Sequence, residues 1–180
     1  TTMSKIFALE GEWSNNYKTE ITVLPGLQLL QQTVGIPFIH RTAATHAELF
    51  YHLKRSATYS SYDILYLAFH GEKGALWFPS EGEVTLKYLA EHYGEAFKDK
   101  YILISSCSVA KNEADIQAFK KATGAKAVAA YRKNVLFFES MLLDLACLQS
   151  INELTLASAW RNRMEKEQGW LVEKTGLVIV

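Results

Sequence analysis

The sequence predicts an α/β fold in three layers, with helices on both faces of a mostly parallel central sheet. Apolar runs of strand length alternate with helical patterns along the chain. The runs are almost continuously apolar, which is typical of parallel strands that are buried on both faces. A length of 180 residues suits one domain of this class, so we expect residues 3–180 to form a single domain.

Two strands and two helices are expected in the first third of the chain. Short apolar runs at 6–9 and 36–39 predict strands, and apolar residues at helical spacing between them predict a helix over 25–34. Apolar residues on one side of 43–55 predict a second helix. Thr42 is expected as its N-cap, because a hydroxyl there accepts a hydrogen bond from a free backbone N–H.

The middle of the chain contains the clearest strand signals. Residues 62–69 and 101–106 are mostly apolar, as expected for buried strands. Two short extended pieces around a turn predict an edge hairpin over 74–84. Thr85 is expected to cap a helix that reaches about Phe97.

The last third of the chain repeats the alternation. A helix over 113–123 ends at Gly124, and glycine is a favoured C-cap because it adopts the left-handed conformation without strain. The remaining expected elements are a strand at 125–131, helices at 135–149 and 153–168, and a strand at 177–180.

The composition excludes several classes of function. Nineteen basic and nineteen acidic side chains give zero net charge, so we expect neither nucleic acid nor a membrane as partner. No apolar run reaches the roughly 18 residues of a membrane span, and no signal segment opens the chain. Cys107 and Cys147 cannot build a disulfide framework, which favours a reducing cytoplasm. The histidine spacing indicates no metal site, and we expect no cofactor.

Two reactive residues follow the two clearest strands. His70 comes directly after one and Cys107 directly after the other. In a parallel sheet, ligands bind beyond the carboxyl ends of the strands, so neighbouring strands would bring both side chains to one crevice. The imidazole and the start of the following helix would favour the nucleophilic thiolate. The Gly71 amide could stabilise a developing oxyanion. Taken singly, each of these residues is more often structural than catalytic.

The order of these residues restricts the class of thiol enzyme. All five histidines precede Cys107, whereas papain-like peptidases need a histidine downstream of the nucleophile. A cysteine phosphatase needs an arginine six residues after its cysteine, and position 113 is Glu. Among thiol enzymes, this leaves those in which the histidine precedes the cysteine and each residue follows a parallel strand.

Two motifs in this order resemble the caspase-like cysteine peptidases. The strand that ends in His70-Gly71 looks like the one carrying their catalytic His-Gly, and the strand before Cys107 looks like the one ending in their nucleophile. The segment 124–131 resembles a later strand of the bacterial CHAT group, which is the closest version. The resemblance implies a three-layer caspase-like fold. It implies Cys107 as nucleophile, His70 as its proton-handling partner, and the amides of Gly71 and Cys107 as the oxyanion hole.

The chain also departs from the caspases proper. They carry Gln-Ala-Cys-x-Gly at the nucleophile and a histidine about 50 residues upstream. Here Ser105 and Ser106 precede Cys107, and 37 residues separate it from His70. These departures speak against a caspase and leave the broader group intact.

The resemblance implies a substrate pocket built from the strand ends, with Glu10, Ser105, Tyr131 and Arg132 as its candidates. Glu10 would favour a basic residue before the scissile bond, and Arg132 an acidic one. The two charges would partly cancel, and each could equally be a solvated loop charge. Glu10 directly follows a buried strand, which slightly favours the basic preference.

The leading hypothesis is a cysteine endopeptidase that cleaves a protein or peptide substrate. Such a nucleophile would be toxic if always active, which favours activation by a protein partner. The alternative is an inactive caspase-fold module that binds a protein partner through the same crevice. A flavodoxin-like ligand-binding domain is less favoured, because the loop at 11–16 lacks a phosphate-binding glycine pattern.

Overall fold

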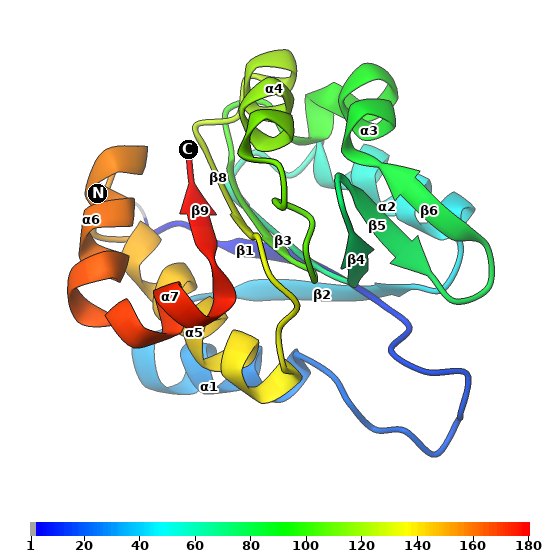
Figure 1. The fold of residues 1–180 in the computed structure, drawn as a ribbon, viewed down its shortest axis with the longest axis horizontal. Helices are drawn as coiled ribbons and strands as arrows, with labels where there is room; N and C mark the ends of the chain where they lie inside the picture. The colour runs from blue at the N-terminus through cyan, green and yellow to red at the C-terminus, as the bar shows by residue number, and fades with distance from the viewer. Residues whose placement is uncertain (1–2) are drawn as a thin grey trace.

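Six segments, all but the edge strand β2 mostly apolar, pair into one central sheet in the computed structural model, which describes residues 3–180 (Figure 1). The strand order is β2-β1-β3-β7-β8-β9, and the pairs are parallel except that β9 runs antiparallel to β8. The strands are β1 (Ile6–Gly11), β2 (Phe38–Ala43), β3 (Ile64–Ala68), β7 (Tyr101–Ser105), β8 (Ala127–Tyr131) and β9 (Leu177–Ile179).

Helices cover both faces of this sheet, which confirms the predicted three-layer α/β fold (Figure 1). On one side lie α1 (Leu24–Val34), α5 (Phe137–Ile151), α6 (Ala157–Glu167) and α7 (Gly169–Thr175). On the other lie α2 (His46–Ser56), α3 (Leu86–Tyr93), the short 3-10 helix η1 (Gly94–Ala96) and α4 (Glu113–Thr123).

Alternate residues of each strand enter two separate cores. In β3, Leu65 and Leu67 pack on the side of α2, α3 and α4, whereas Ile64 and Tyr66 pack on the side of α1 and α5. A strand buried on both faces needs apolar residues at nearly every position, which is the continuous pattern seen in the sequence.

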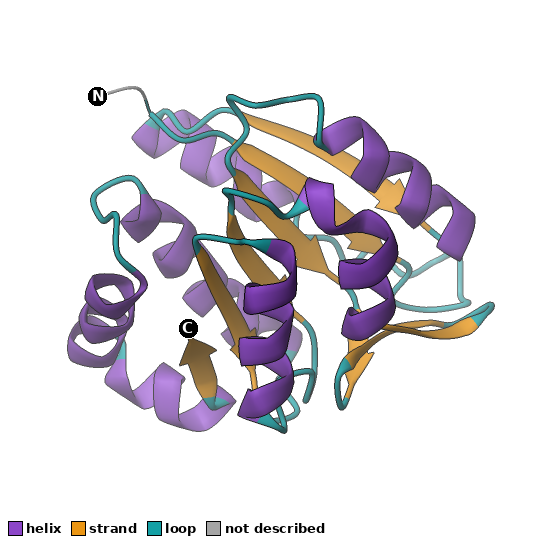
Figure 2. Cartoon of the chain, turned by 90° about the horizontal axis from the view of Figure 1, so that it is seen from above, coloured by secondary structure: helices purple, strands orange, loops and turns teal. Residues whose placement is uncertain are grey.

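A second, smaller sheet stands apart from the central one (Figure 2). It consists of β4 (His70–Glu72), β5 (Ala75–Phe78) and β6 (Gly82–Thr85), all antiparallel. The predicted hairpin is confirmed as β5 and β6, and β4 adds a strand that the sequence did not indicate. The small sheet begins at His70 itself, so the chain leaves the central sheet where the reactive histidine stands.

The predicted N-cap of the second helix is wrong. Thr42 lies in β2, and Thr45 caps α2 instead, accepting a hydrogen bond from the Glu48 N–H at 3.2 Å. The Glu48 carboxylate in turn accepts from the Thr45 hydroxyl at 3.1 Å. This pairing resembles a capping box and starts the helix three residues later than predicted, because β2 continues along β1 as far as Ala43.

The C-terminal region also differs from the prediction. The helix expected at 153–168 is α6, which begins at Ala157 after an irregular segment. A further helix, α7, follows it and ends at Gly176 in the left-handed conformation. Gly176 allows the chain to reverse into β9, whose antiparallel direction was not predicted.

The strand order places one topological switch point next to the expected site. From β1 the chain goes first to β2 on one side, and later to β3 on the other. Ligands bind at such a point, beyond the carboxyl ends of the strands. Over residues 3–180 no helix is both long and apolar enough to cross a membrane.

Replacing the observed cap tests the helix start. Thr45→Ala should lower the free energy of unfolding by about 1 kcal/mol, because the Glu48 amide loses its acceptor. Thr45→Ser, which keeps the hydroxyl, should stay close to the parent in urea denaturation. Equal losses in both variants would contradict the capping role.

Candidate active site

His70 and Cys107 leave neighbouring strands at the same level of the sheet. Ala68 of β3 pairs with Ser105 of β7, and each reactive residue lies two positions further along its own strand direction. Paired strands lie about 4.8 Å apart, so the two backbones arrive side by side.

Gly71 brings the two segments into direct contact. A Cβ atom built on Gly71 would lie 2.6 Å from Ser106 Cβ, 2.9 Å from Cys107 O and 3.3 Å from Cys107 N. No real side chain fits at such distances, so the contact requires glycine at this position. The histidine segment therefore packs on the backbone of Cys107.

Both reactive side chains line one cavity of about 220 Å³. Its walls are mainly apolar and aromatic, as in most small-molecule and peptide pockets. The apolar wall is formed by Trp13, Ile21, Val23, Phe69, Val135, Leu136, Phe137 and Met141. The polar groups that reach it belong to His70, Ser105, Ser106, Cys107, Ser140 and Asp144.

Trp13 holds the imidazole of His70. The His70 Nε2 atom lies 2.8 Å from the Trp13 carbonyl oxygen, and the two rings meet edge to face with their centroids 5.2 Å apart. A carbonyl oxygen only accepts hydrogen bonds, so Nε2 must carry the hydrogen. In the neutral ring, Nδ1 is then the nitrogen that can take up a proton.

The Cys107 sulfur lies against the backbone of Val135. The Val135 N–H donates to Sγ at 3.3 Å, and the Val135 carbonyl oxygen is 3.6 Å from Sγ. An N–H directed at sulfur stabilises negative charge on it. The expectation that a helix start would do so is not met: α4 begins only at Glu113, and its first turn carries acidic side chains.

Ser108, the residue after Cys107, is held in an unusual conformation. Ser108 has φ of 55°, in the left-handed region that non-glycine residues seldom adopt. It stays there because its N–H donates to the Lys133 carbonyl and its hydroxyl donates to Asn134 Oδ1 at 2.6 Å. Strain of this kind is found at functional sites where surrounding contacts enforce it.

The backbone N–H of Cys107 is available to a ligand. Within residues 3–180 it has no hydrogen-bond acceptor. The Gly71 segment packs on it, and the two amides are the ones expected from the sequence to form an oxyanion hole. The close packing of Gly71 on Cys107 is compatible with the expectation that their two amides bind one oxyanion.

A carboxylate lies at the base of the cavity. Asp144 of α5 is 1% exposed and accepts hydrogen bonds from the hydroxyls of Tyr66, at 2.6 Å, and of Tyr131. Burial raises the pKa of Asp144 to about 6, although hydrogen bonds from Ser105, Tyr131 and Tyr66 oppose the rise. Burial and the nearby charge of Asp144 raise the pKa of both tyrosines, so their hydroxyls stay protonated and donate.

The four predicted substrate residues occupy different places. Ser105 lines the cavity. Tyr131 lies beneath it, where its buried hydroxyl holds Asp144. Arg132 is outside the cavity, paired with Glu113 on the surface, so its prediction as a substrate contact is not supported.

Glu10, the fourth, also lies outside the cavity, and the prediction that it binds substrate is not supported. It is 2% exposed, and its carboxylate already accepts four hydrogen bonds. The donors are Trp13 Nε1 and Thr22 Oγ1, both at 2.6 Å, and the Val23 N–H and His40 Nε2, both at 2.8 Å. Burial alone raises the pKa of Glu10, but the four hydrogen bonds outweigh burial and leave the pKa lowered.

Asp144 and Trp13 are the site residues that the sequence reasoning missed. Asp144 had a detectable signal, since it is an acidic residue on the buried side of α5, next to Ser140 and Leu148 in helical spacing. Trp13 had none, because it lies in an irregular loop and reaches His70 only through the fold of that loop.

The lowered pKa of Glu10 predicts a specific dependence of stability on pH. The folded-state pKa is below the ordinary value of 4.5, so the stabilisation by ionised Glu10 is complete above pH 4.5 and disappears as the pH falls through the lower folded value. At pH 7, Glu10→Gln should cost about 1 kcal/mol, because neutral acceptors form weaker hydrogen bonds. The difference from the parent should vanish in acid, as measured by urea denaturation between pH 7 and 3. A constant difference would contradict this.

Comparison with known proteins identifies a family whose function is unknown. No curated protein matches the chain. One family model, described as a family of unknown function (DUF6642), matches residues 3–175, which is nearly the whole chain. The chain therefore belongs to the DUF6642 family.

Proposed function

We propose that this protein is a cysteine endopeptidase that uses Cys107 and His70. The observation that carries the proposal is that both side chains line one cavity, from corresponding positions beyond two neighbouring parallel strands. The order of histidine and cysteine along these strands supports the resemblance to caspase-like peptidases.

The first half of the reaction would transfer the acyl group to Cys107. The thiolate sulfur attacks the carbonyl carbon of the scissile peptide, and the oxyanion accepts hydrogen bonds from the amides of Cys107 and Gly71. The tetrahedral intermediate collapses when the C–N bond breaks and the His70 imidazolium gives its proton to the leaving amine. A thioester on Cys107 remains.

The second half would release the acid. His70, now neutral, accepts a proton from water at Nδ1, because Nε2 already carries the hydrogen that it donates to Trp13 O. The hydroxide formed attacks the thioester carbonyl, the C–S bond breaks, and the Cys107 thiolate is regenerated with the carboxylic acid product.

Asp144 supports a basic residue at the position before the scissile bond. Its pKa of about 6 leaves it mostly ionised at pH 7.5, and in residues 3–180 no cationic side chain pairs with it. A buried charge without a counter-ion is costly, and a lysine or arginine side chain of the substrate would compensate it. The basic preference inferred from Glu10 is thus assigned to a different carboxylate.

A reducing, cytoplasmic location suits this chemistry. Both cysteines are free, and a nucleophilic thiol loses activity when it is oxidised. Activation by a protein partner would be consistent with the contacts of the Cys107 sulfur, which face Val135 rather than His70.

The same contacts favour a second candidate, a catalytically inactive module that binds a protein partner in this cavity. In such a module the sulfur would stay against Val135 and the cavity would take an apolar or basic side chain without cleaving the chain. Labelling of Cys107 distinguishes the two functions.

Substitution of the two reactive residues tests the peptidase. Cys107→Ala should abolish cleavage of a peptide library, because the nucleophile is removed. His70→Ala should lower kcat/KM by about 100-fold or more, the usual contribution of a proton-transfer residue. Cleavage that persists in both variants would refute the assignment of Cys107 and His70 as the catalytic residues.

A peptide acyloxymethyl ketone with arginine next to the warhead should add its mass to Cys107, as read by peptide mass spectrometry. Cys147→Ala is the matched control, since it removes the other, fully buried thiol and should leave the labelling unchanged. Absence of labelling, with cell lysate added as a source of partners, would favour the binding module.

The charge of Asp144 predicts a pH-dependent specificity. The ratio of kcat/KM for an arginine peptide to that for its citrulline counterpart should be about 10- to 100-fold at pH 7.5, the worth of a charge-assisted hydrogen bond. It should fall as the pH drops through about 6, where the free carboxyl takes up a proton. Asp144→Asn should give a ratio near one at every pH. Because the same enzyme cleaves both peptides, the ratio reports substrate preference alone, and an unchanged ratio in the variant would refute the role of Asp144.

A further inference from the structure

We infer that Glu10 is a positioning residue for His70, which it orients through Trp13. The inference rests on the proposed function for its meaning in catalysis, but the geometry that carries it is independent of that function. Glu10 lies at the end of β1, outside the cavity, and its carboxylate is linked to His70 through Trp13, the residue that holds the histidine.

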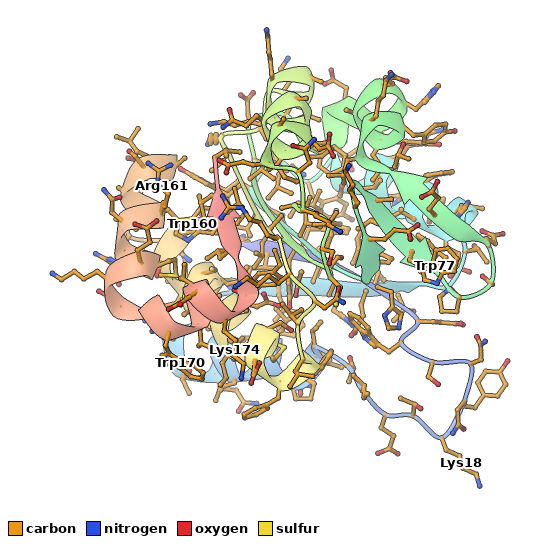
Figure 3. The ribbon with its side chains drawn as sticks, in the orientation of Figure 1. Lys18, Trp77, Trp160, Arg161, Trp170 and Lys174 are labelled. Atoms are coloured by element: carbon orange, nitrogen blue, oxygen red, sulfur yellow. The ribbon has the colours of Figure 1, made fainter. Side chains whose placement is uncertain are left out.

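The loop between β1 and α1 needs such an anchor. Residues 12–22 contain no helix or strand, and Figure 1 shows the loop extending away from the body of the molecule. Lys18 lies at its far end in Figure 3, and Tyr17 beside it is fully exposed. A segment with so few packed side chains has little local stability of its own.

The Glu10 carboxylate joins both ends of this loop. Trp13, at its beginning, donates its indole N–H, and Thr22 and Val23, at its end, donate a hydroxyl and a backbone N–H. The acceptor is buried and ionised, so each of these hydrogen bonds is of the stronger, charge-assisted type. The loop is therefore closed at its base by one side chain.

Trp13 transmits this anchoring to His70 in two ways. Its carbonyl oxygen accepts from Nε2, and its ring contacts the imidazole edge to face. The same indole ring also meets Phe137 edge to face, with centroids 5.3 Å apart. Without the hydrogen bond to Glu10, only apolar contacts would hold the indole ring. Trp13 would then be more mobile, and its carbonyl oxygen would hold His70 less firmly.

The two carboxylate oxygens have different requirements. Oε2 faces the Trp13 indole and the Val23 amide, which can only donate. Oε1 faces the Thr22 hydroxyl and the His40 ring, each of which can donate or accept. A glutamine at position 10 can therefore keep its oxygen toward Trp13 and its NH₂ toward Thr22 and His40. A leucine offers no acceptor at all.

These requirements define the experiment. Glu10→Leu should lower kcat about tenfold or more with little change in KM, whereas Glu10→Gln should keep most of the parent kcat. Trp13→Phe keeps the backbone carbonyl and an aromatic ring but lacks the indole N–H, and it should reproduce the loss. Trp13→Phe also tests the inference if Glu10→Leu does not fold. Thr45→Ala, which removes the cap of α2 and changes no residue that lines the cavity, is the control for loss of stability alone.

The tautomer of His70 can be measured by NMR spectroscopy, and a loss of stability alone does not change it. Long-range ¹H–¹⁵N correlation spectra at pH 8 report which nitrogen of each histidine carries the hydrogen, and His70→Gln assigns the signal. The parent, Glu10→Gln and Thr45→Ala should show His70 with hydrogen on Nε2. Glu10→Leu and Trp13→Phe should show a mixture of both tautomers.

The outcomes separate this inference from the proposed function. Unchanged His70 signals in Trp13→Phe, or a loss in Glu10→Gln as large as in Glu10→Leu, would overturn the positioning role. A tautomer mixture as predicted in a protein that cleaves no peptide would support the positioning of His70 and refute the peptidase.

Discussion

The parallel pairing of β3 with β7 is the constraint on which the site depends. It sets Ala68 opposite Ser105, and the two chains leave the sheet together, one toward β4 and the other into a turn. The close approach of Gly71 to the Cys107 backbone follows from that pairing. A slip of one residue in register would exchange the two faces of the strand, expose one core and separate the two reactive side chains. The apolar cores therefore enforce the geometry of the polar site.

Two buried carboxylates illustrate how hydrogen bonding decides the chemistry of similar groups. Glu10 accepts four hydrogen bonds, and its pKa is lowered in spite of burial. Asp144 is buried among hydroxyl donors, and its pKa is raised to about 6 because burial outweighs them. The first carboxylate is saturated within the protein and has a structural task. The second retains a charge that a cationic ligand can compensate. Their difference explains why the acidic residue at a strand end is an anchor and the one on a helix is the better candidate for substrate binding.

Much of the fold was predictable because it depends on local pattern. Apolar runs located five of the six strands of the central sheet, and a left-handed glycine ended α4 as expected. The sixth, β2, begins two residues later and ends four residues later than the apolar run at 36–39 predicted, because its outer half is polar and exposed. The errors arose where pairing competes with local preference. Thr42 has the residue type of a cap, but β2 extends through it along β1. The antiparallel direction of β9 depends on the reversal after α7, which no periodicity encodes.

The amino-acid sequence alone establishes the order of His70 and Cys107 along the chain. It also establishes that each follows a buried strand, because a strand buried on both faces is apolar at nearly every position. Which carboxylate faces the cavity, and what orients the histidine, depended on the tertiary structure. Asp144 is 37 residues from Cys107 along the chain, and Trp13 is 57 residues from His70. Contacts at such separations follow from how α5 and the β1–α1 loop pack at the carboxyl edge of the sheet. The residue types alone could not distinguish the Glu10 carboxylate, which accepts four hydrogen bonds outside the cavity, from the Asp144 carboxylate, which lines the cavity, because that difference lies in the donors and the cavity that the fold brings to each.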